Sequence, residues 1–293
     1  MATAPKTGHD ERTASQPRRS ELHDVTIKAV ENVNQSIRTY RLASRQTISF
    51  LPGQWLDVHI HGLPKPGGFT ITSSPLLANL DTCGEDGPSV DLAIQASPEN
   101  PAAEWLWKPE KEIVGQPLRI RVGGSFVWPP EYFTTAPRKE SDIQNVVFIA
   151  GGVGINPLMA MIRHLGLTDT MPPNVNFLYS VKAPPTIPDE GRVTALFLDD
   201  LVDIARTSGS GKGKLRLKLF SSNYKYAEAL SQHGAIIAPR RIRHEDLLSA
   251  LGDKKESTVC YVCGPPDMTD QFVEFLQGQD GLEKEQVLCE KWW

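Results

Sequence analysis

The chain has 293 residues, which is longer than an average domain and leads us to expect two domains. Hydrophobic residues make up 40% and charged residues 23%, as in ordinary globular proteins, and the net charge of -4 argues against a protein that binds nucleic acid. Apolar runs stay well short of the ~20 residues that cross a bilayer, so we expect no membrane span.

The first segment, residues 1–20, is rich in Ala, Thr, Ser, Pro and mixed charge without apolar periodicity, and we expect it to be a disordered tail. Arg12, Arg18 and Arg19 would suit a mitochondrial presequence, whereas Asp10 and the missing amphipathic stripe oppose one. The four cysteines are too few and too scattered for a disulfide scaffold. We therefore expect a cytoplasmic protein, with the mitochondrial matrix as the alternative.

Residues 21–130 carry short β-rich runs separated by Gly and Pro, a spacing typical of an antiparallel β-barrel. The connector to the second domain is expected over 131–144, where Pro, Thr, Lys, Ser and acidic residues dominate. The runs expected to form the barrel strands are 24–29, 39–42, 54–59, 69–73, 90–95 and 118–122.

In residues 145–293 apolar strands alternate with helices, which predicts an α/β domain with a doubly wound parallel sheet. Its first strand, 146–150, is an uninterrupted apolar run, the mark of a strand buried on both faces. The helix after it has apolar residues at i, i+3, i+4 and i+7. The further strands are expected at 175–179, 214–220, 258–263 and 286–290, with helices around 193–204, 244–251 and 268–276.

A glycine-rich segment, Ala-Gly-Gly-Val-Gly-Ile-Asn-Pro over 150–157, links that first buried strand to its helix. Glycines permit a tight turn and a close ligand approach, and the free N–H groups of the helix start suit a pyrophosphate. A structural strand-to-helix turn is the alternative. An ordinary Rossmann dehydrogenase fits poorly, because Pro157 replaces the third small residue and the second strand ends in Tyr179 and Ser180 rather than an acidic residue.

A second segment, Val-Cys-Tyr-Val-Cys-Gly-Pro-Pro-Asp-Met over 259–268, contains a Cys-x-x-Cys spacing. On a strand, Cys260 and Cys263 would lie about 10 Å apart on opposite faces, which excludes a disulfide, and no second pair completes a metal site. We therefore assign Cys260 to packing. Cys263 falls at the carboxyl end of a parallel strand, where open α/β sheets bind ligands.

These two segments, with Gly-Gly-Phe-Thr-Ile-Thr-Ser-Ser-Pro over 67–75, occur in an order and at a spacing that resemble the ferredoxin–NADP reductase superfamily. The resemblance covers about residues 24–293. The chain end Glu-Lys-Trp-Trp over 290–293 is most similar to the subgroup of oxidoreductase NAD-binding domain-containing proteins.

The resemblance implies a flavin, expected to be FAD, held by the barrel with its ring between the domains and a nicotinamide stacked on it. Phe69 matches the aromatic residue that packs on the ring, although it also suits a core position in a strand. The catalytic residues implied are Thr70, Cys263 and Glu290, with no metal. The cofactor-binding residues implied are Phe69, Thr70, Ile71, Thr72, Ser73, Gly124, Gly151, Gly152, Val153, Gly154, Ile155, Pro157, Ser180, Cys263, Gly264, Pro265, Met268 and Trp292.

Two departures from the family pattern concern the flavin phosphates. Gly67 stands where the family has an arginine, and Ala103 stands where a Ser or Thr is usual. The missing charge-assisted contact is worth ~1.5–3 kcal/mol, so we expect weak flavin binding unless backbone N–H groups near Ser73 or Gly124 compensate.

The nucleotide is expected to be NADH or NADPH. Members that prefer NADPH carry a Ser-Arg pair after the third strand of the second domain, and here Asn223 follows Ser222. This favours NADH, although Lys225 or Arg192 could bind a 2′-phosphate instead.

We therefore expect electrons to pass from NAD(P)H through FAD to a separate acceptor, either a protein or a small molecule. The alternative is a nucleotide-binding redox sensor that has lost its flavin, and the departures at Gly67 and Ala103 keep that alternative open.

Overall fold

The structure is a computed structural model that describes residues 8–184, 195–208, 213–231 and 235–292. Its contacts divide the chain into two compact units. The first contains Met1–Trp128, Met159–His164 and Trp292–Trp293, and the second contains Pro129–Leu158 and Leu165–Lys291. The division after Trp128 lies next to the expected connector over 131–144. No helix in the described ranges has both the length and the apolar composition needed to cross a membrane.

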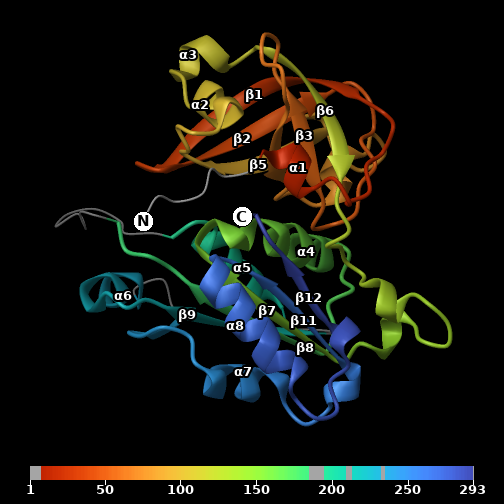
Figure 1. Ribbon diagram of the computed structural model, residues 1–293, viewed down its shortest axis with the longest axis vertical. Helices are drawn as coiled ribbons and strands as arrows, with labels where there is room; N and C mark the ends of the chain where they lie inside the picture. Colours follow the sequence, from red (N-terminus) through yellow and green to blue (C-terminus); the bar gives the residue numbers. More distant parts are fainter. Residues whose placement is uncertain (1–7, 185–194, 209–212, 232–234, 293) are drawn as a thin grey trace. The chain divides into compact units, whose positions relative to one another are not determined.

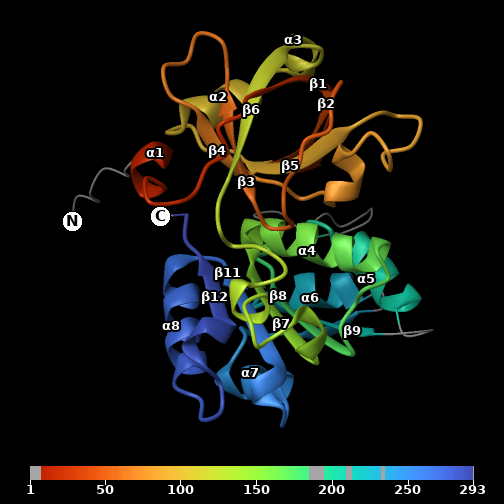
Figure 2. The ribbon, with the colours of Figure 1, turned by 90° about the vertical axis from the view of Figure 1, so that its right-hand side faces the viewer.

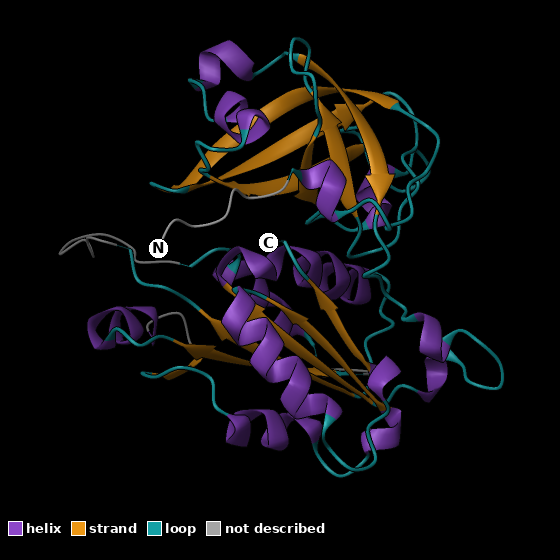
Figure 3. Ribbon diagram, viewed as in Figure 1, coloured by secondary structure: helices purple, strands orange, loops and turns teal. Residues whose placement is uncertain are grey.

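The first unit contains a six-stranded antiparallel sheet that curls like a barrel (Figures 1 and 3). Its strand order is β4-β3-β6-β1-β2-β5. The two edge strands approach each other at an isolated bridge between Ile71 and Leu92, but no continuous ladder of described residues closes the barrel. The strands are β1 (His23–Asn34), β2 (Ile37–Ser44), β3 (Trp55–His59), β4 (Gly67–Thr70), β5 (Ser89–Gln95) and β6 (Pro117–Gly123).

The core of this unit follows from the alternation of side chains along its strands. In β1 the residues alternate between buried and exposed, so Val25 and Ile27 face the core. Two short helices, α2 (Pro101–Leu106) and α3 (Glu110–Ile113), add apolar side chains to it. The Tyr40 hydroxyl donates a hydrogen bond of 2.7 Å to the Leu106 carbonyl oxygen, which ties α2 to β2.

Residues 8–19 form an ordered segment that we call the N-terminal strap, whereas the sequence predicted a disordered tail over 1–20. The strap begins with the short helix α1 (His9–Arg12). Its far end pairs with β6, because the Arg19 N–H donates to the Val122 carbonyl and the Gly124 N–H donates to the Pro17 carbonyl. Composition does not reveal these contacts, since they depend on strands distant in sequence.

The second unit contains a six-stranded parallel sheet, as the sequence predicted, with the order β10-β9-β8-β7-β11-β12 (Figure 2). The chain builds outward from β7 to β10 and then returns to the other side of β7, so the strand order reverses between β7 and β11. Ligands of open α/β sheets bind at such a switch point. The strands are β7 (Asn145–Gly151), β8 (Asn174–Ser180), β9 (Lys214–Phe220), β10 (Ile236–Ala238), β11 (Thr258–Cys263) and β12 (Val287–Glu290).

Helices of the second unit cover this sheet. Apolar residues of α7 and α8 pack on one face with the alternate residues of β7, β11 and β12, including Val147, Cys260 and Val287. The helices are α4 (Ile155–Leu167), α5 (Leu198–Thr207), α6 (Tyr224–Ser231), α7 (His244–Leu251) and α8 (Pro266–Gln277). The 3-10 helices of the chain are η1 (Pro75–Ala78), η2 (Glu131–Phe133), η3 (Glu140–Asp142), η4 (Gly152–Gly154), η5 (Lys255–Ser257) and η6 (Lys284–Gln286).

Candidate functional site

The glycine-rich segment after β7 forms the turn of η4 and leads directly into α4. Gly152 has a φ of +56°, which L-residues rarely adopt, and a Cβ atom built on it would meet no atom within 4 Å. Gly152 is exposed, so a ligand can approach the backbone of this turn. The combination of a left-handed glycine, an open side and a helix start is the geometry expected of a phosphate-binding turn.

The neighbouring glycines have a different role, because they pack against the segment that follows β11. A Cβ atom on Gly154 would collide with the carbonyl of Cys263 and lie 2.7 Å from the Gly264 nitrogen. A Cβ atom on Gly151 would lie 2.6 Å from Cδ of Pro265. The sequence predicted that these glycines admit a ligand, and the structure shows that Gly151 and Gly154 also bring the two motifs into contact.

Strand pairing explains why the two motifs meet. Cys263 lies opposite Ala150 on adjacent parallel strands, so both strands end at the same edge of the sheet. Ser180 ends β8 opposite Gly151 and is partly exposed. The structure thus gathers most of the expected nucleotide-binding residues at the switch point: Gly151, Gly152, Val153, Gly154, Ile155, Pro157, Ser180, Cys263, Gly264, Pro265 and Met268.

Cys263 and Glu290 lie opposite each other at the ends of β11 and β12. Cys263 is fully buried, and neither it nor Cys260 forms a disulfide. Burial raises the pKa of Glu290 well above its ordinary value. Its Oε2 atom is buried and has no hydrogen-bond partner among the described residues. The strand ends therefore place a buried thiol beside a carboxyl group of raised pKa.

Two cationic side chains on and after β9 and β10 are relevant to the choice between NADH and NADPH. Lys218 and Arg240 both bind Asp246, with distances of 2.7 Å from Nζ to Oδ1 and 2.6 Å from Nη1 to Oδ2. The Asn223 side chain accepts a hydrogen bond from the Tyr226 N–H and so caps α6. Arg192 lies outside the described residues. Lys218 and Arg240 are thus already paired.

In the first unit, pairing with β3 fixes which way each residue of β4 faces. Phe69 lies opposite Leu56 and belongs to the core cluster, as the alternative interpretation of this residue expected. Thr70 lies opposite Trp55, on the other face of the strand. The aromatic side chain is therefore turned into the barrel, and the hydroxyl of Thr70 is on the opposite side of the strand.

The positions expected to hold the flavin phosphates are closed by packing. A Cβ atom on Gly67 would lie 2.5 Å from Cβ of Ala102 in α2. The N–H groups of Ala102 and Ala103 already donate to the Asn100 side chain, at 3.1 and 3.3 Å. Gly67 and these two N–H groups therefore offer a diphosphate no contact between β4 and α2.

The polar residues that follow β4 hold the two edge strands together. The Thr72 hydroxyl donates to the Asp91 carbonyl, and the Ser73 hydroxyl accepts from the Asp91 N–H at 2.9 Å. Ile71 is fully buried. Gly124 has a φ of +99° and packs against the indole of Trp55. These contacts give Ile71, Thr72, Ser73 and Gly124 structural roles.

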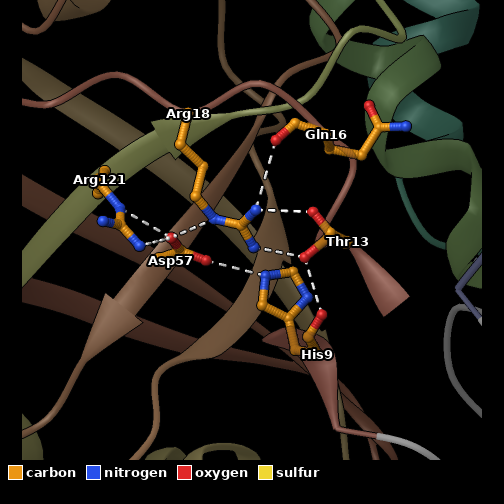
Figure 4. Close-up of polar contacts among 6 residues, drawn as sticks. All are labelled: His9, Thr13, Gln16, Arg18, Asp57 and Arg121. Carbon is orange, nitrogen blue, oxygen red and sulfur yellow. Dashed lines mark hydrogen bonds and ion pairs between the residues drawn. The ribbon is translucent and has the colours of Figure 1, made fainter. Parts of the chain in front are cut away.

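A further polar cluster lies on the outer face of β3 and is centred on the fully buried Asp57 (Figure 4). The sequence motifs did not predict it. Its carboxylate accepts from His9 Nε2 at 3.0 Å, from Arg18 Nε at 3.0 Å and from Arg121 Nη2 at 2.7 Å. The His9 ring also lies parallel to that of Trp292, with centroids 6.3 Å apart. The available signal in the sequence is a single carboxylate inside the apolar run over 55–58.

Comparisons with known proteins show which family the chain belongs to. No family model matches it. Oxidoreductase NAD-binding domain-containing protein 1 of Xenopus laevis is 32% identical over 304 residues, which covers 100% of this chain and 86% of the relative. The reductase component of propane 2-monooxygenase from Mycolicibacterium smegmatis is 23% identical over 270 residues, or 89% and 65% of the two chains.

Among solved structures, a ferredoxin NADP+ reductase from Neisseria gonorrhoeae with bound FAD and NADP superposes with a TM-score of 0.62 at 16% identity, covering 93% of this chain and 99% of that chain. This likeness and the two sheets define the fold as that of the ferredoxin–NADP reductases. At the level of sequence, the chain belongs to the family of oxidoreductase NAD-binding domain-containing protein 1.

Proposed function

We propose that this protein is an NAD(P)H-dependent oxidoreductase that passes electrons through a flavin, FAD in the first instance, to a separate acceptor. The observation that carries the proposal is the pair of interlocked motifs at the switch point of the parallel sheet, with the open left-handed turn at Gly152. The backbone N–H groups of this turn and the start of α4 would bind the nucleotide pyrophosphate.

We infer a preference for NADH over NADPH. A 2′-phosphate needs a free cation, and Lys218 and Arg240 are engaged by Asp246. Burial alone would raise the pKa of Asp246, but hydrogen bonds from Arg240 and Lys218 hold its pKa below the ordinary value, so the carboxylate stays ionised and keeps both cations. Lys225 is exposed and remains the residue to test for the NADPH alternative.

The flavin would supply hydride acceptance and onward electron delivery, and the chain would supply orientation and polarity. Thr70 offers a hydroxyl group on the outer face of β4, and Trp292 offers an aromatic surface. In the second unit Glu290 offers a carboxyl group whose pKa burial raises, and Cys263 packs at the end of β11 beside it. We assign these side chains to positioning the reacting rings and holding a proton.

The acceptor is proposed to be a separate protein or small molecule. The Mycolicibacterium relative is named as the reductase component of propane 2-monooxygenase, which supports this part of the proposal. No group of three or more His, Cys, Asp or Glu side chains in the described part of this chain could hold a metal ion. We propose that electrons leave the protein from the flavin.

A second candidate function, a nucleotide-binding redox sensor without flavin, is favoured by one specific observation. Gly67 packs directly on Ala102, and Asn100 occupies the N–H groups of α2, so the barrel lacks the phosphate contacts of an FAD site.

An absorbance titration separates the two functions. The purified protein, incubated with FAD or FMN, is expected to show flavin bands that bleach when NADH is added without oxygen. NADH binding is measured in parallel by calorimetry. A protein that binds NADH yet stays colourless at saturating FAD and FMN would be the sensor, and one that binds neither would contradict both functions.

A further inference from the structure

The N-terminal strap closes the outer face of β4. The ring of His9 covers Gly68 so closely that a Cβ atom on that glycine would collide with it. Trp55 meets this ring edge-on, with centroids 4.8 Å apart, and Trp292 lies parallel to it. Thr70, the next residue of β4 on this face, is 5% exposed. All of these residues belong to the first unit, so the closure is a property of that unit alone.

The closed face conflicts with what the proposed function requires. That function assigns the Thr70 hydroxyl and the Trp292 ring to positioning the reacting rings, so a flavin must be able to reach both. In the structure Thr70 is buried and the Trp292 ring lies against that of His9. Gly152 of the second unit, by contrast, is exposed and has open space at its Cβ position. The nucleotide turn is thus open, whereas the face that the flavin needs is shut.

The strap lies on a core that is complete without it. The core cluster of the first unit begins at Val25 and includes none of the described strap residues, 8–19. The buried residues of the strap are His9 and Thr13, which are both polar. Its far end pairs with β6 through the Arg19 N–H and the Pro17 carbonyl. Because segments with few buried apolar contacts open locally at low free-energy cost, the strap can lift about this paired end while the barrel stays folded.

Opening of residues 8–16 leaves the carboxylate of Asp57 paired. It gives up the bond from His9 but keeps those from Arg121, whose Nε and Nη2 atoms donate to Oδ2 at 2.9 and 2.7 Å (Figure 4). While the strap is closed, Nδ1 of His9 is buried without a hydrogen-bond partner among the described residues. A buried unpaired atom costs free energy, and opening exposes this one to water. Closure therefore carries a penalty that opening removes.

Arg18 joins the covering part of the strap to the barrel. Its Nε atom donates to Asp57 at 3.0 Å, and its Nη1 atom donates to the Thr13 carbonyl at 2.7 Å. Its guanidinium group also lies over the ring of Trp55, 4.8 Å from the ring centroid. Arg19 follows directly, is exposed, and joins β6 through its backbone N–H. Substitution of Arg18 therefore loosens the strap, whereas substitution of Arg19 keeps the backbone bond to β6.

We propose that the N-terminal strap is an autoinhibitory segment, which closes the outer face of β4 and admits a flavin only after residues 8–16 have left that face. The inference rests on the flavin-dependent function proposed above and adds its regulation. Because strap closure and flavin binding exclude each other, the apparent dissociation constant of FAD equals the intrinsic constant divided by the fraction of protein with an open strap. A change that loosens the strap therefore tightens flavin binding.

The first test compares Arg18→Gln with Arg19→Gln by titration of FAD, followed by quenching of flavin fluorescence. Arg18→Gln is expected to lower the dissociation constant of FAD about three- to tenfold, because the closed strap loses contacts worth about one hydrogen bond. Arg19→Gln removes the same charge and should leave the constant unchanged. An Arg18→Gln variant that binds FAD as the unaltered protein does, or more weakly, would overturn the proposal.

The second test deletes residues 1–16, which removes the cover over Gly68 and keeps the pairing of Pro17 and Arg19 with β6. The shortened protein is expected to bind FAD at least about tenfold more tightly than the full chain. Circular dichroism checks that it folds. Equal and measurable FAD affinities of the two proteins would overturn the autoinhibition alone. Failure of both proteins to bind FAD or FMN would contradict the flavin-dependent function itself, and the autoinhibition with it.

The third test needs no variant, so it stands even where substitution or deletion impairs folding. Limited digestion of the full chain with trypsin compares cleavage after Arg12, in the strap, with cleavage after Arg45, an exposed residue of the same unit. Saturating FAD is expected to speed cleavage after Arg12 about three- to tenfold, because the bound flavin keeps the strap open, and to leave cleavage after Arg45 unchanged. Cleavage after Arg12 that FAD slows or leaves unchanged would overturn the proposal.

Discussion

Gly152 has a left-handed φ of +56° and open space at its Cβ position, where we propose that the nucleotide pyrophosphate binds. Gly152→Val is expected to weaken NADH binding at least about tenfold, because the branched side chain would occupy the proposed pyrophosphate site. Isothermal calorimetry measures the dissociation constant, and a thermal melt measures the cost of strain, about 1–2 kcal/mol.

The control for this substitution is Gly252→Val at the C-terminal cap of α7. Gly252 also has a positive φ, +63°, and open space around its Cβ position. It should therefore show a loss of stability at least as large as that of Gly152→Val, with unchanged NADH affinity. If both variants bind NADH as the unaltered protein does, Gly152 does not line the nucleotide site.

Cys263 and Cys260 form a second matched pair, on one strand but on opposite faces. Cys263→Ala is expected to slow flavin reduction by NADH several-fold more than it weakens NADH binding, because the side chain positions the ring rather than the phosphates. Cys260→Ala removes the same atom from the α7–α8 face and should leave the rate unchanged. Stopped-flow reduction decides the point, and equal rates for both variants would remove Cys263 from the site.

At the scale of elements, the N-terminal strap is joined to β3 and β6 through one carboxylate. Asp57→Asn is expected to destabilise the first unit by about 3 kcal/mol, the cost typical of removing one partner from a buried ion cluster. Urea unfolding measures this change. Asp86→Asn breaks the solvent-exposed pair with Lys28 and should leave the midpoint almost unchanged. Similar midpoints for the two variants would show that the strap contributes little.

The same carboxylate sets a pH dependence with a definite sign. Because the folded pKa of Asp57 lies below its ordinary value of 3.8, its contribution is fully present above that value and is lost as the pH falls from there through the folded pKa. The free energy of unfolding should therefore decline more steeply below about pH 4 in the unaltered protein than in Asp57→Asn. Parallel pH profiles would contradict this assignment.

The elements that the sequence predicted are those whose local pattern decides their structure. The apolar run over 146–150 is typical of a strand buried on both faces, and it forms β7, one of the two central strands of the sheet. Phe69 shows the limit of such patterns. It follows two glycines on an edge strand, so nothing local indicates which face becomes the core, and pairing with Leu56 makes that choice.

The candidate site was predictable to a similar extent. Strand order brought the motifs around Gly152 and Cys263 together, as the parallel sheet led us to expect. The roles of Gly151 and Gly154 were not predictable, because they depend on how closely two loops distant in sequence approach each other. The His9–Asp57 contact joins residues 48 apart, and it too follows from tertiary packing rather than from any local signal.

At the scale of the whole molecule, the two units carry separate cores and separate proposed ligands. The core of the first unit gathers residues from β1 to β6, and that of the second gathers residues from β7 to β12. A ligand that binds only the folded form stabilises the segments that hold it, by about 2.7 kcal/mol at 100 times its dissociation constant. Each ligand should therefore leave its own pattern of protection along the chain.

Hydrogen exchange followed by mass spectrometry measures that pattern. NADH is expected to slow exchange in the turn after β7 and in the segment after β11, whereas FAD should slow it in β4. Gly152→Val supplies the control, because it should lose the protection by NADH and keep the protection by FAD. Protection by NADH confined to β4 and the strap would contradict the assignment of the nucleotide to the parallel sheet.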